Sequence, residues 1–576
     1  MDERWTLADA RPWPARVLAL VVALLVTGPA LAPGFVLLRD MVFVPRQDLD
    51  VDALGLGGSL PRAVPVDAVV GLLTSVVPGQ LLQKVVLVGT VYLAVLGAAR
   101  LLPPGEDGSR GPAALVAGLV YGWSPYVAER SLIGHWTLLV AYAALPWVLR
   151  QSLRLRAGTP GALPRLLVAV APAALSPTGS VLAGAVVLVT VGRARAPVAI
   201  GGVLVLSAPW IVAGALHPAG GISDPAGVAA FAARAEGWGG TLLAVLGGGG
   251  IWNAGAVPGS RASVLVPLLT LLVLGLAVLG WSARRMHTRP ATGLLVLGGV
   301  GVMLACAGTV PGASDLLEWA VGAVPGAGLL RDGQKWVAWW ALPVAIGAGL
   351  GAGRLLEGAR ARGGRPAGLG LATVLALLPV LAVPDLAWGV GGRLQAVDYP
   401  ADWQRVRDAL ADRDGDVLVL PFGAYRAFGW NDERPQLDPA PRWLPRPTVT
   451  DDELVVGGRP VAGEDERART VAAAAGDPEE LARLGVGWVL VERGTPGRPI
   501  PAAVAGLPVV VEGADLRLHR VPGAASSPSP SPVRVTAVGG THALALGVCV
   551  VAVLWIIAAT STVTARRPPS WKRVPR

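Results

Sequence analysis

The stretch ARVLALVVALLVTGPALAPGFVLLRD, residues 15–40, decides the fold near the start of the chain. Its first part, residues 15–32, is apolar and long enough for a helix that crosses the hydrocarbon core of a bilayer. The quoted stretch ends with the charged pair Arg39-Asp40. We expect an uncleaved first span and not a signal peptide, because the run is long and prolines flank the only candidate cleavage site, Ala30-Leu31-Ala32.

Similar apolar runs recur along the whole chain. Of its 576 residues, 53% are hydrophobic and only 15% are charged, whereas soluble domains carry roughly 25% charged residues. The fold class is therefore mainly α, a polytopic transmembrane helix bundle of about twelve spans. The predicted spans are 15–32, 81–101, 112–128, 135–149, 164–177, 179–192, 197–215, 262–282, 291–310, 335–353, 367–384 and 541–561.

The charges of the loops predict the orientation of these spans. Every second loop is rich in arginine and nearly free of acid, and such loops stay in the cytoplasm. Both termini are then cytoplasmic, and loops 33–80, 217–260 and 312–334 face outward. We predict a multi-pass protein of the plasma membrane. The pair 164–177 and 179–192 is short for two spans, and its break is either a tight outer turn or a discontinuous helix lining a cavity.

The charge pattern also divides the chain into parts. Residues 1–384 form the predicted bundle, and residues 385–525 form a small extracytoplasmic α/β domain. Residues 526–540 are a Ser/Pro linker, and 541–576 hold the last span with a basic cytoplasmic tail. Within the domain we predict helices at 401–411, 464–475 and 477–484, strands at 417–420 and 487–491, and a hairpin at 507–511 and 516–521.

Charge and cysteine content exclude two classes of function. A net charge of +10 and a pI near 10.3 would suit nucleic acid in a soluble protein. Here the basic residues lie in short loops between spans, so we expect no nucleic-acid partner. Cys306 and Cys549 both fall within apolar spans, which excludes a disulfide framework and a cysteine zinc site in the outer domain.

Asp40 is the candidate catalytic residue. It follows the first span so closely that an ionisable group there is costly unless it is paired or functional. A carboxylate in this place can act as a general base on a hydroxyl, or hold a divalent cation against a phosphate. The alternative is an interfacial Asp paired with Arg39 or Arg46. Alternating aspartates at 48, 50 and 52 are typical of a solvated loop.

Two further clusters are candidate substrate-binding sites. Glu129, Arg130 and His135 lie at the predicted outer ends of two spans and can form a polar pocket facing Asp40. Arg331 and Lys335 are cations on the side where the charge rule predicts few, and they suit a lipid phosphate. The alternative for the two cations is a local pair with Asp332. The alternatives for the first cluster are anchoring at the membrane interface and a structural role for the histidine.

Aromatic residues of the outer domain allow two interpretations. They lie beside polar side chains in segments without regular periodicity, so they suit either sugar stacking or docking onto the bundle. They are Trp403, Tyr425, Phe428, Trp430 and Trp443.

Several motifs resemble a known family. They are Ala32-Pro33-Gly34 with Arg39-Asp40, the run Tyr121 to Tyr126, Gly134-His135, Leu145-Pro146-Trp147 and Leu330 to Lys335. Together they resemble actinobacterial membrane glycosyltransferases of the GT-C class, namely the arabinofuranosyltransferase D-like proteins, and the related YfhO-like membrane proteins. The resemblance implies a polyprenyl-phosphate sugar donor and an acidic catalytic base in the first outer loop, which maps to Asp40. The large C-terminal carbohydrate-binding modules of that family are not present in this sequence.

These observations predict a membrane glycosyltransferase-like protein. It would transfer a sugar from a polyprenyl-phosphate donor to a glycan or lipid acceptor of the cell envelope, in contact with membrane lipids. The competing hypothesis is a non-catalytic membrane protein that handles or scaffolds polyprenyl-linked glycans. The sequence leaves the metal unknown, a divalent cation included.

Overall fold

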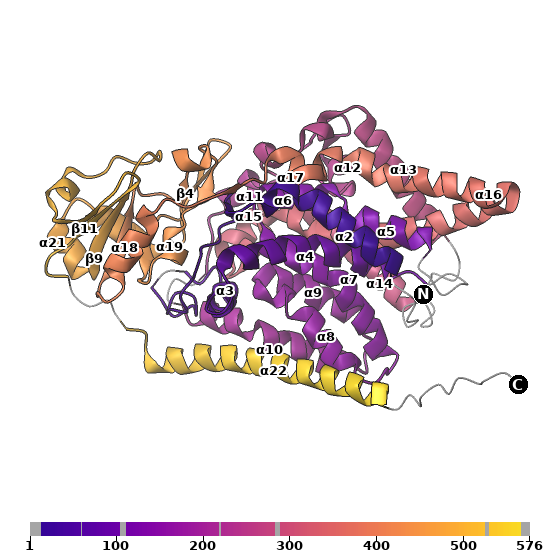
Figure 1. Ribbon diagram of the computed structural model, residues 1–576, viewed down its shortest axis with the longest axis horizontal. Coiled ribbons are helices and arrows are strands. Elements are labelled where there is room, and N and C mark those ends of the chain that lie inside the picture. Colours follow the sequence, from indigo (N-terminus) through magenta and orange to yellow (C-terminus); the bar gives the residue numbers. More distant parts are fainter. Residues whose placement is uncertain are drawn as a thin grey trace, which may run out of the picture.

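A long helical bundle carries a small α/β domain at one end (Figure 1). The computed structural model describes residues 13–58, 60–103, 111–217, 221–282, 288–524 and 529–565. The bundle helices are α2 (Trp13–Thr27), α4 (Gly79–Ala99), α5 (Pro112–Gly122), α7 (Trp136–Arg156), α8 (Ala162–Val170), α9 (Pro177–Thr190), α10 (Ala196–Ala215), α13 (Leu265–Trp281), α14 (Arg289–Ala307), α16 (Val337–Ala382) and α22 (Pro532–Ala565). Shorter helices in the connections are α3 (Val66–Thr74), α6 (Pro125–Leu132), α11 (Ala226–Ala230), α12 (Gly240–Leu246), α15 (Ala313–Ala323) and α17 (Ala387–Gly392).

Helices cover each predicted span. Among the described residues, six helices are long and apolar enough to cross a membrane, and three shorter apolar helices accompany them. The chain is thus a helical membrane protein, while the number of crossings and their orientation stay predictions. The helix α16 accounts for two predicted spans, because it is interrupted at Gly364, whose φ of +68° glycine adopts readily.

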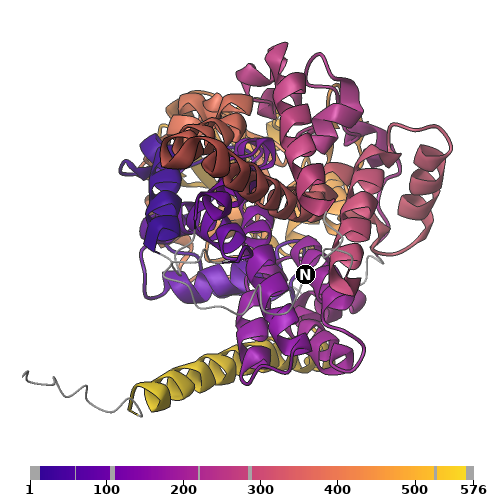
Figure 2. The same ribbon diagram turned by 90° about the vertical axis from the view of Figure 1, so that its right-hand side faces the viewer.

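Two boundaries differ from the prediction. The span 112–128 is broken, because the Ser124 hydroxyl accepts a hydrogen bond from the Val127 N–H and so begins the new helix α6. The last helix begins at Pro532, so most of the predicted linker 526–540 is helical. Part of that linker, 526–528, and the end of the predicted tail, 566–576, lie outside the described residues. Figure 2 shows α22 at the edge of the bundle, where it contacts α8 and α10.

The α/β domain is built on a five-stranded sheet. Its strands are β3 (Asp416–Leu420), β6 (Thr448–Val449), β9 (Val486–Glu492), β10 (Val509–Glu512) and β11 (Leu516–Arg520), in the order β10-β11-β9-β3-β6. Its helices are α18 (Asp402–Leu410), α19 (Ala440–Trp443), α20 (Glu466–Ala474) and α21 (Pro478–Arg483). The predicted strands, hairpin and helices of this region are confirmed.

Short strand pairs surround this sheet and reach the bundle. They are β1 (Phe35–Val36) with β2 (Ala396–Val397), β4 (Tyr425–Arg426) with β5 (Gln436–Leu437), and β7 (Leu454–Val456) with β8 (Arg459–Val461). The pairing of β1 with β2 brings the loop after α2 against the domain.

Most of the domain's aromatic residues fill its own core. Trp403, Phe428 and Trp443 are at most 4% exposed and pack on one face of the sheet. Trp430 stacks on Phe428, with ring centroids 4.9 Å apart. Tyr425 differs, because it is 37% exposed and points away from this core.

Candidate active site

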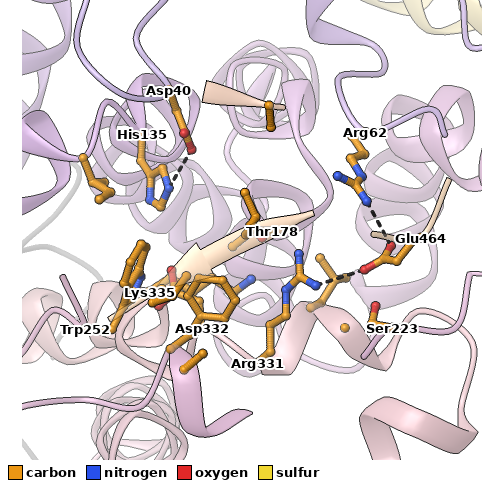
Figure 3. Close-up of a pocket in the computed structure, with 18 of the residues that line it drawn as sticks. Asp40, Arg62, His135, Thr178, Ser223, Trp252, Arg331, Asp332, Lys335 and Glu464 are labelled. Atoms are coloured by element: carbon orange, nitrogen blue, oxygen red, sulfur yellow. Dashed lines mark hydrogen bonds and ion pairs between the residues drawn. The ribbon is translucent and has the colours of Figure 1, made fainter. Parts of the chain in front are cut away.

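A cavity of about 1760 Å³ lies between the bundle and the α/β domain. Segments far apart in sequence line it: Arg39-Asp40, the start of α7, the start of α9, residues 325–335 and the hairpin β7–β8. The break between α8 and α9 is part of this wall, since Ser176, Pro177 and Thr178 line the cavity. Figure 3 shows Asp40 and His135 on one side of this space and Arg331, Asp332 and Lys335 across from them.

Asp40 is fixed by one residue from the bundle and one from the domain. The Nε2 atom of His135 lies 3.0 Å from its Oδ2, and the Tyr425 hydroxyl donates a hydrogen bond to its Oδ1. The Arg39 guanidinium instead donates to the Leu132 carbonyl, 2.5 Å away. Asp40 is therefore held by His135 and Tyr425, and the alternative, a pair with Arg39 or Arg46, is not found among the described residues.

These contacts keep the Asp40 carboxyl ionised. Burial raises the pKa of Asp40, but the hydrogen bonds from His135 and Tyr425 act against burial. Their sum holds the pKa of Asp40 below its ordinary value. The side chain of Asp40 stays 31% exposed, so an ionised carboxylate faces the cavity.

Arg130 lies behind His135 and fixes its tautomer. The Arg130 Nη1 is 2.7 Å from His135 Nδ1. Because a guanidinium only donates hydrogen bonds, Nδ1 must accept, and the ring proton sits on Nε2. His135 can then donate a hydrogen bond from Nε2 to the Asp40 carboxylate.

The same guanidinium forms a two-point contact with Asp332. Its Nη1 and Nη2 lie 2.7 and 3.0 Å from the two carboxylate oxygens of Asp332, and Nη2 also donates to Gln334. Burial raises the pKa of Asp332, but the charge of Arg130 reverses this and holds the pKa well below its ordinary value. Asp332 thus forms its ion pair with Arg130, in place of the local pair with Arg331 or Lys335 that was the alternative for these cations.

Two predicted ligand residues do not reach the cavity. The side chains of Arg130 and Glu129 are fully buried, and Glu129 accepts a hydrogen bond from the Ile251 N–H at 3.1 Å. A direct contact with substrate, which we expected of both, does not follow from this geometry. Both instead support the residues that do line the cavity.

Arg331 and Lys335 line the cavity. The Nη1 atom of Arg331 lies 2.9 Å from the Glu464 carboxylate of the domain. Lys335 is only 9% exposed, and its Nζ lies 5.4 Å from the centre of the Trp336 ring. Within the described part of the chain, that ammonium has no hydrogen-bond acceptor and no ion-pair partner at contact distance. A buried cation in this state suits an anionic ligand.

Two residues that contact the predicted site are not among those that the sequence predicts for it. Tyr425 was considered only for sugar stacking or docking, and Asp332 only as a local partner of the cations. Asp332 lies inside a run that the family resemblance had singled out. For Tyr425 the sequence offers no signal, because 385 residues separate it from Asp40.

No group of three or more His, Cys, Asp or Glu side chains is placed to hold a metal ion among the described residues. A divalent cation therefore stays a prediction.

Solved structures share this fold. The arabinofuranosyltransferase AftD from Mycobacteria is similar over 91% of this chain, with 18% sequence identity and a TM-score of 0.56. This chain has the fold of a GT-C membrane glycosyltransferase. A mutant form of AftD matches 90% of the chain at 18% identity and a TM-score of 0.55. The chain spans about two-fifths of AftD, 41% of its length. No protein-family model matches the sequence, and no curated protein does.

Proposed function

We propose that this protein is a glycosyltransferase of the plasma membrane that uses a polyprenyl-phosphate sugar as donor. The acceptor is a hydroxyl of an envelope glycan or lipid on the outer face, where the α/β domain lies. The ionised Asp40 carboxylate, held by His135 at the edge of a large cavity, is the observation that carries this proposal.

The donor phosphate binds at Lys335 and Arg331. Lys335 offers a buried ammonium that forms no ion pair with the described residues, and Arg331 adds a planar guanidinium at the same wall of the cavity. The lipid chain extends from the cavity into the bilayer between the helices. Arg130 and Glu129 hold this wall from behind through Asp332 and Gln334.

Asp40 acts as the general base in the transfer. It takes the proton of the acceptor hydroxyl while the acceptor oxygen forms a bond to the anomeric carbon of the donor sugar. The bond from that carbon to the phosphate oxygen breaks, and its electron pair leaves with the polyprenyl phosphate, whose charge Lys335 stabilises. General-base catalysis of this kind contributes about 10²- to 10⁴-fold to a rate.

Replacing Asp40→Asn tests the proposal. The change preserves shape and removes the base, so we expect glycan transfer in isolated membranes to fall about 10²- to 10⁴-fold. Asp48→Asn is the matched control, because Asp48 belongs to the same loop but pairs with Arg407, 2.6 Å away. Envelope glycans of a deletion strain complemented with each variant give the readout. Unchanged glycans with Asp40→Asn, at a normal protein level, would favour the scaffold hypothesis.

A further inference from the structure

The loop that carries Asp40 is built into the α/β domain as a strand. Phe35 and Val36 pair with Val397 and Ala396, antiparallel. The Asn431 side chain, fully buried, donates to the Leu37 carbonyl at 3.0 Å. The Arg39 N–H donates to the Pro435 carbonyl at 2.6 Å, and the Leu437 N–H donates to the Arg39 carbonyl at 2.8 Å. The domain thus binds the backbone on the N-terminal side of Asp40.

The bundle binds the same loop from the opposite side. The Asp40 N–H donates to the Ile133 carbonyl at 3.2 Å. Gly134 approaches so closely that a Cβ there would lie 2.3 Å from the Met41 nitrogen, and its φ is +78°. No side chain fits at this position without moving the loop. Asp40 therefore lies at a junction where the bundle and the domain each fix part of its backbone.

Tyr425 extends this arrangement to the carboxylate. It lies on β4, opposite Leu437 of β5, and β5 is the strand that pairs with Arg39. Its neighbour Arg426 is buried and forms an ion pair with Asp438 at 2.8 Å and with Glu492. The strand that presents the Tyr425 hydroxyl is thus anchored inside the domain.

We propose that the α/β domain completes the catalytic centre, with Tyr425 as a positioning residue that orients the Asp40 carboxylate. This inference rests on the proposed function of Asp40. His135 holds Oδ2 from the bundle and Tyr425 holds Oδ1 from the domain. The rotation of the carboxylate is fixed only when both the bundle and the α/β domain are in place, so the domain contributes to catalysis.

The proposal predicts a change in the pH dependence of activity. The groups that act on Asp40 are His135 at the start of α7, Tyr425 on β4, Arg442 on α19 and Arg39 in the loop itself. The Tyr425 hydrogen bond lowers the pKa of Asp40. Its loss raises that pKa, so the base is protonated at a higher pH and the acidic limb of the rate profile moves upward.

Tyr425→Phe measures this contribution against a matched control. We expect kcat to fall about 10-fold or more, with the KM of the donor changed less than about 2-fold. Tyr399→Phe is the control, because the Tyr399 hydroxyl also donates to this loop, to the Phe43 carbonyl at 3.0 Å, but does not contact Asp40. It should retain the wild-type kcat and pH profile. A wild-type kcat and pH profile for Tyr425→Phe would overturn the inference.

A second measurement tests the contact without using activity. The chain has six tyrosines, so the fluorine resonances of the 3-fluorotyrosine-labelled full chain can be assigned with single Tyr→Phe variants. We expect Asp40→Asn to shift the Tyr425 resonance and to leave that of Tyr399 in place. An unmoved Tyr425 resonance overturns the inference. A shifted resonance together with a fully active Asp40→Asn protein shows instead that the proposed function has failed while the contact exists.

Discussion

Arg130 connects the cavity wall that carries Arg331 and Lys335 to the residues around Asp40. Its guanidinium contacts His135 on one side and Asp332 and Gln334 on the other, with no exposed surface. A buried guanidinium that holds a carboxylate at two points fixes the geometry of its partners more firmly than a lysine can. The two halves of the site therefore share one rigid support.

Replacing Arg130→Met should destabilise the protein by about 3–5 kcal/mol, because it leaves the Asp332 carboxylate buried without a partner. The double variant Arg130→Met with Asp332→Asn should lose less stability, since a neutral amide is cheaper to bury than a charge. Thermal unfolding of the purified proteins in detergent measures both. Equal destabilisation of the single and double variants would contradict the role given to this ion pair.

The loop between α2 and α3 contains a carboxyl group, that of Asp52, whose pKa is raised. Burial, followed by the nearby charges of Asp50 and Asp416, raises the pKa of Asp52 to about 7. The loop contacts the domain close to Asp52, because Gly58 packs near the Arg467 side chain. A group whose pKa is higher in the folded state binds protons more tightly when folded.

The contribution of Asp52 to stability should therefore fall as the pH rises. It is fully present below the unfolded pKa near 3.8 and is lost as the pH passes through about 7. We expect Asp52→Asn to remove this part of the pH dependence and to raise the melting temperature more at pH 8 than at pH 5. Melting curves in detergent at the two pH values measure it. The same increment at both pH values would show that Asp52 does not titrate in this window.

At the scale of helices and strands, local sequence patterns predict the elements themselves. They do not predict where those elements are interrupted. The short apolar runs of β3 and β9, which are buried along their whole length, and the long apolar runs of the helices are both visible in the sequence. The break at Ser124 was missed because the apolar character continues across it. It depends on one hydroxyl that caps a helix.

At the scale of the whole molecule, Glu464 of the domain pairs with two cations that line the cavity. It lies 2.9 Å from Arg331 and 3.6 Å from Arg62, whereas Arg62 also pairs with Asp452 at 2.6 Å. Figure 3 shows this carboxylate between the two arginines. A donor phosphate at Arg331 has to replace it.

Replacing Glu464→Gln should lower the KM of the donor about 2- to 5-fold, because it frees Arg331 from a partly exposed ion pair. Arg331→Met should raise the KM and cancel the effect of Glu464→Gln. Glu453→Gln is the control, since Glu453 also lines the cavity but pairs with Arg498 of the domain at 3.0 Å. Kinetics at varied donor concentration compare the three single variants, and the double variant Glu464→Gln with Arg331→Met, with the wild type. An unchanged KM in Glu464→Gln would show that Arg331 does not contact the phosphate.

The sequence by itself determined the helical membrane bundle, the elements of the α/β domain and the choice of Asp40 as the candidate base. The first follows from composition, the second from periodicity, and the third from the short distance between Asp40 and the first span. Only the tertiary structure decided the partners of each charge. Arg130 pairs with Asp332, Arg331 pairs with Glu464, and Tyr425 reaches Asp40. An ion pair or hydrogen bond depends on separations of a few ångströms. Packing of distant segments sets those separations, and no local pattern records them.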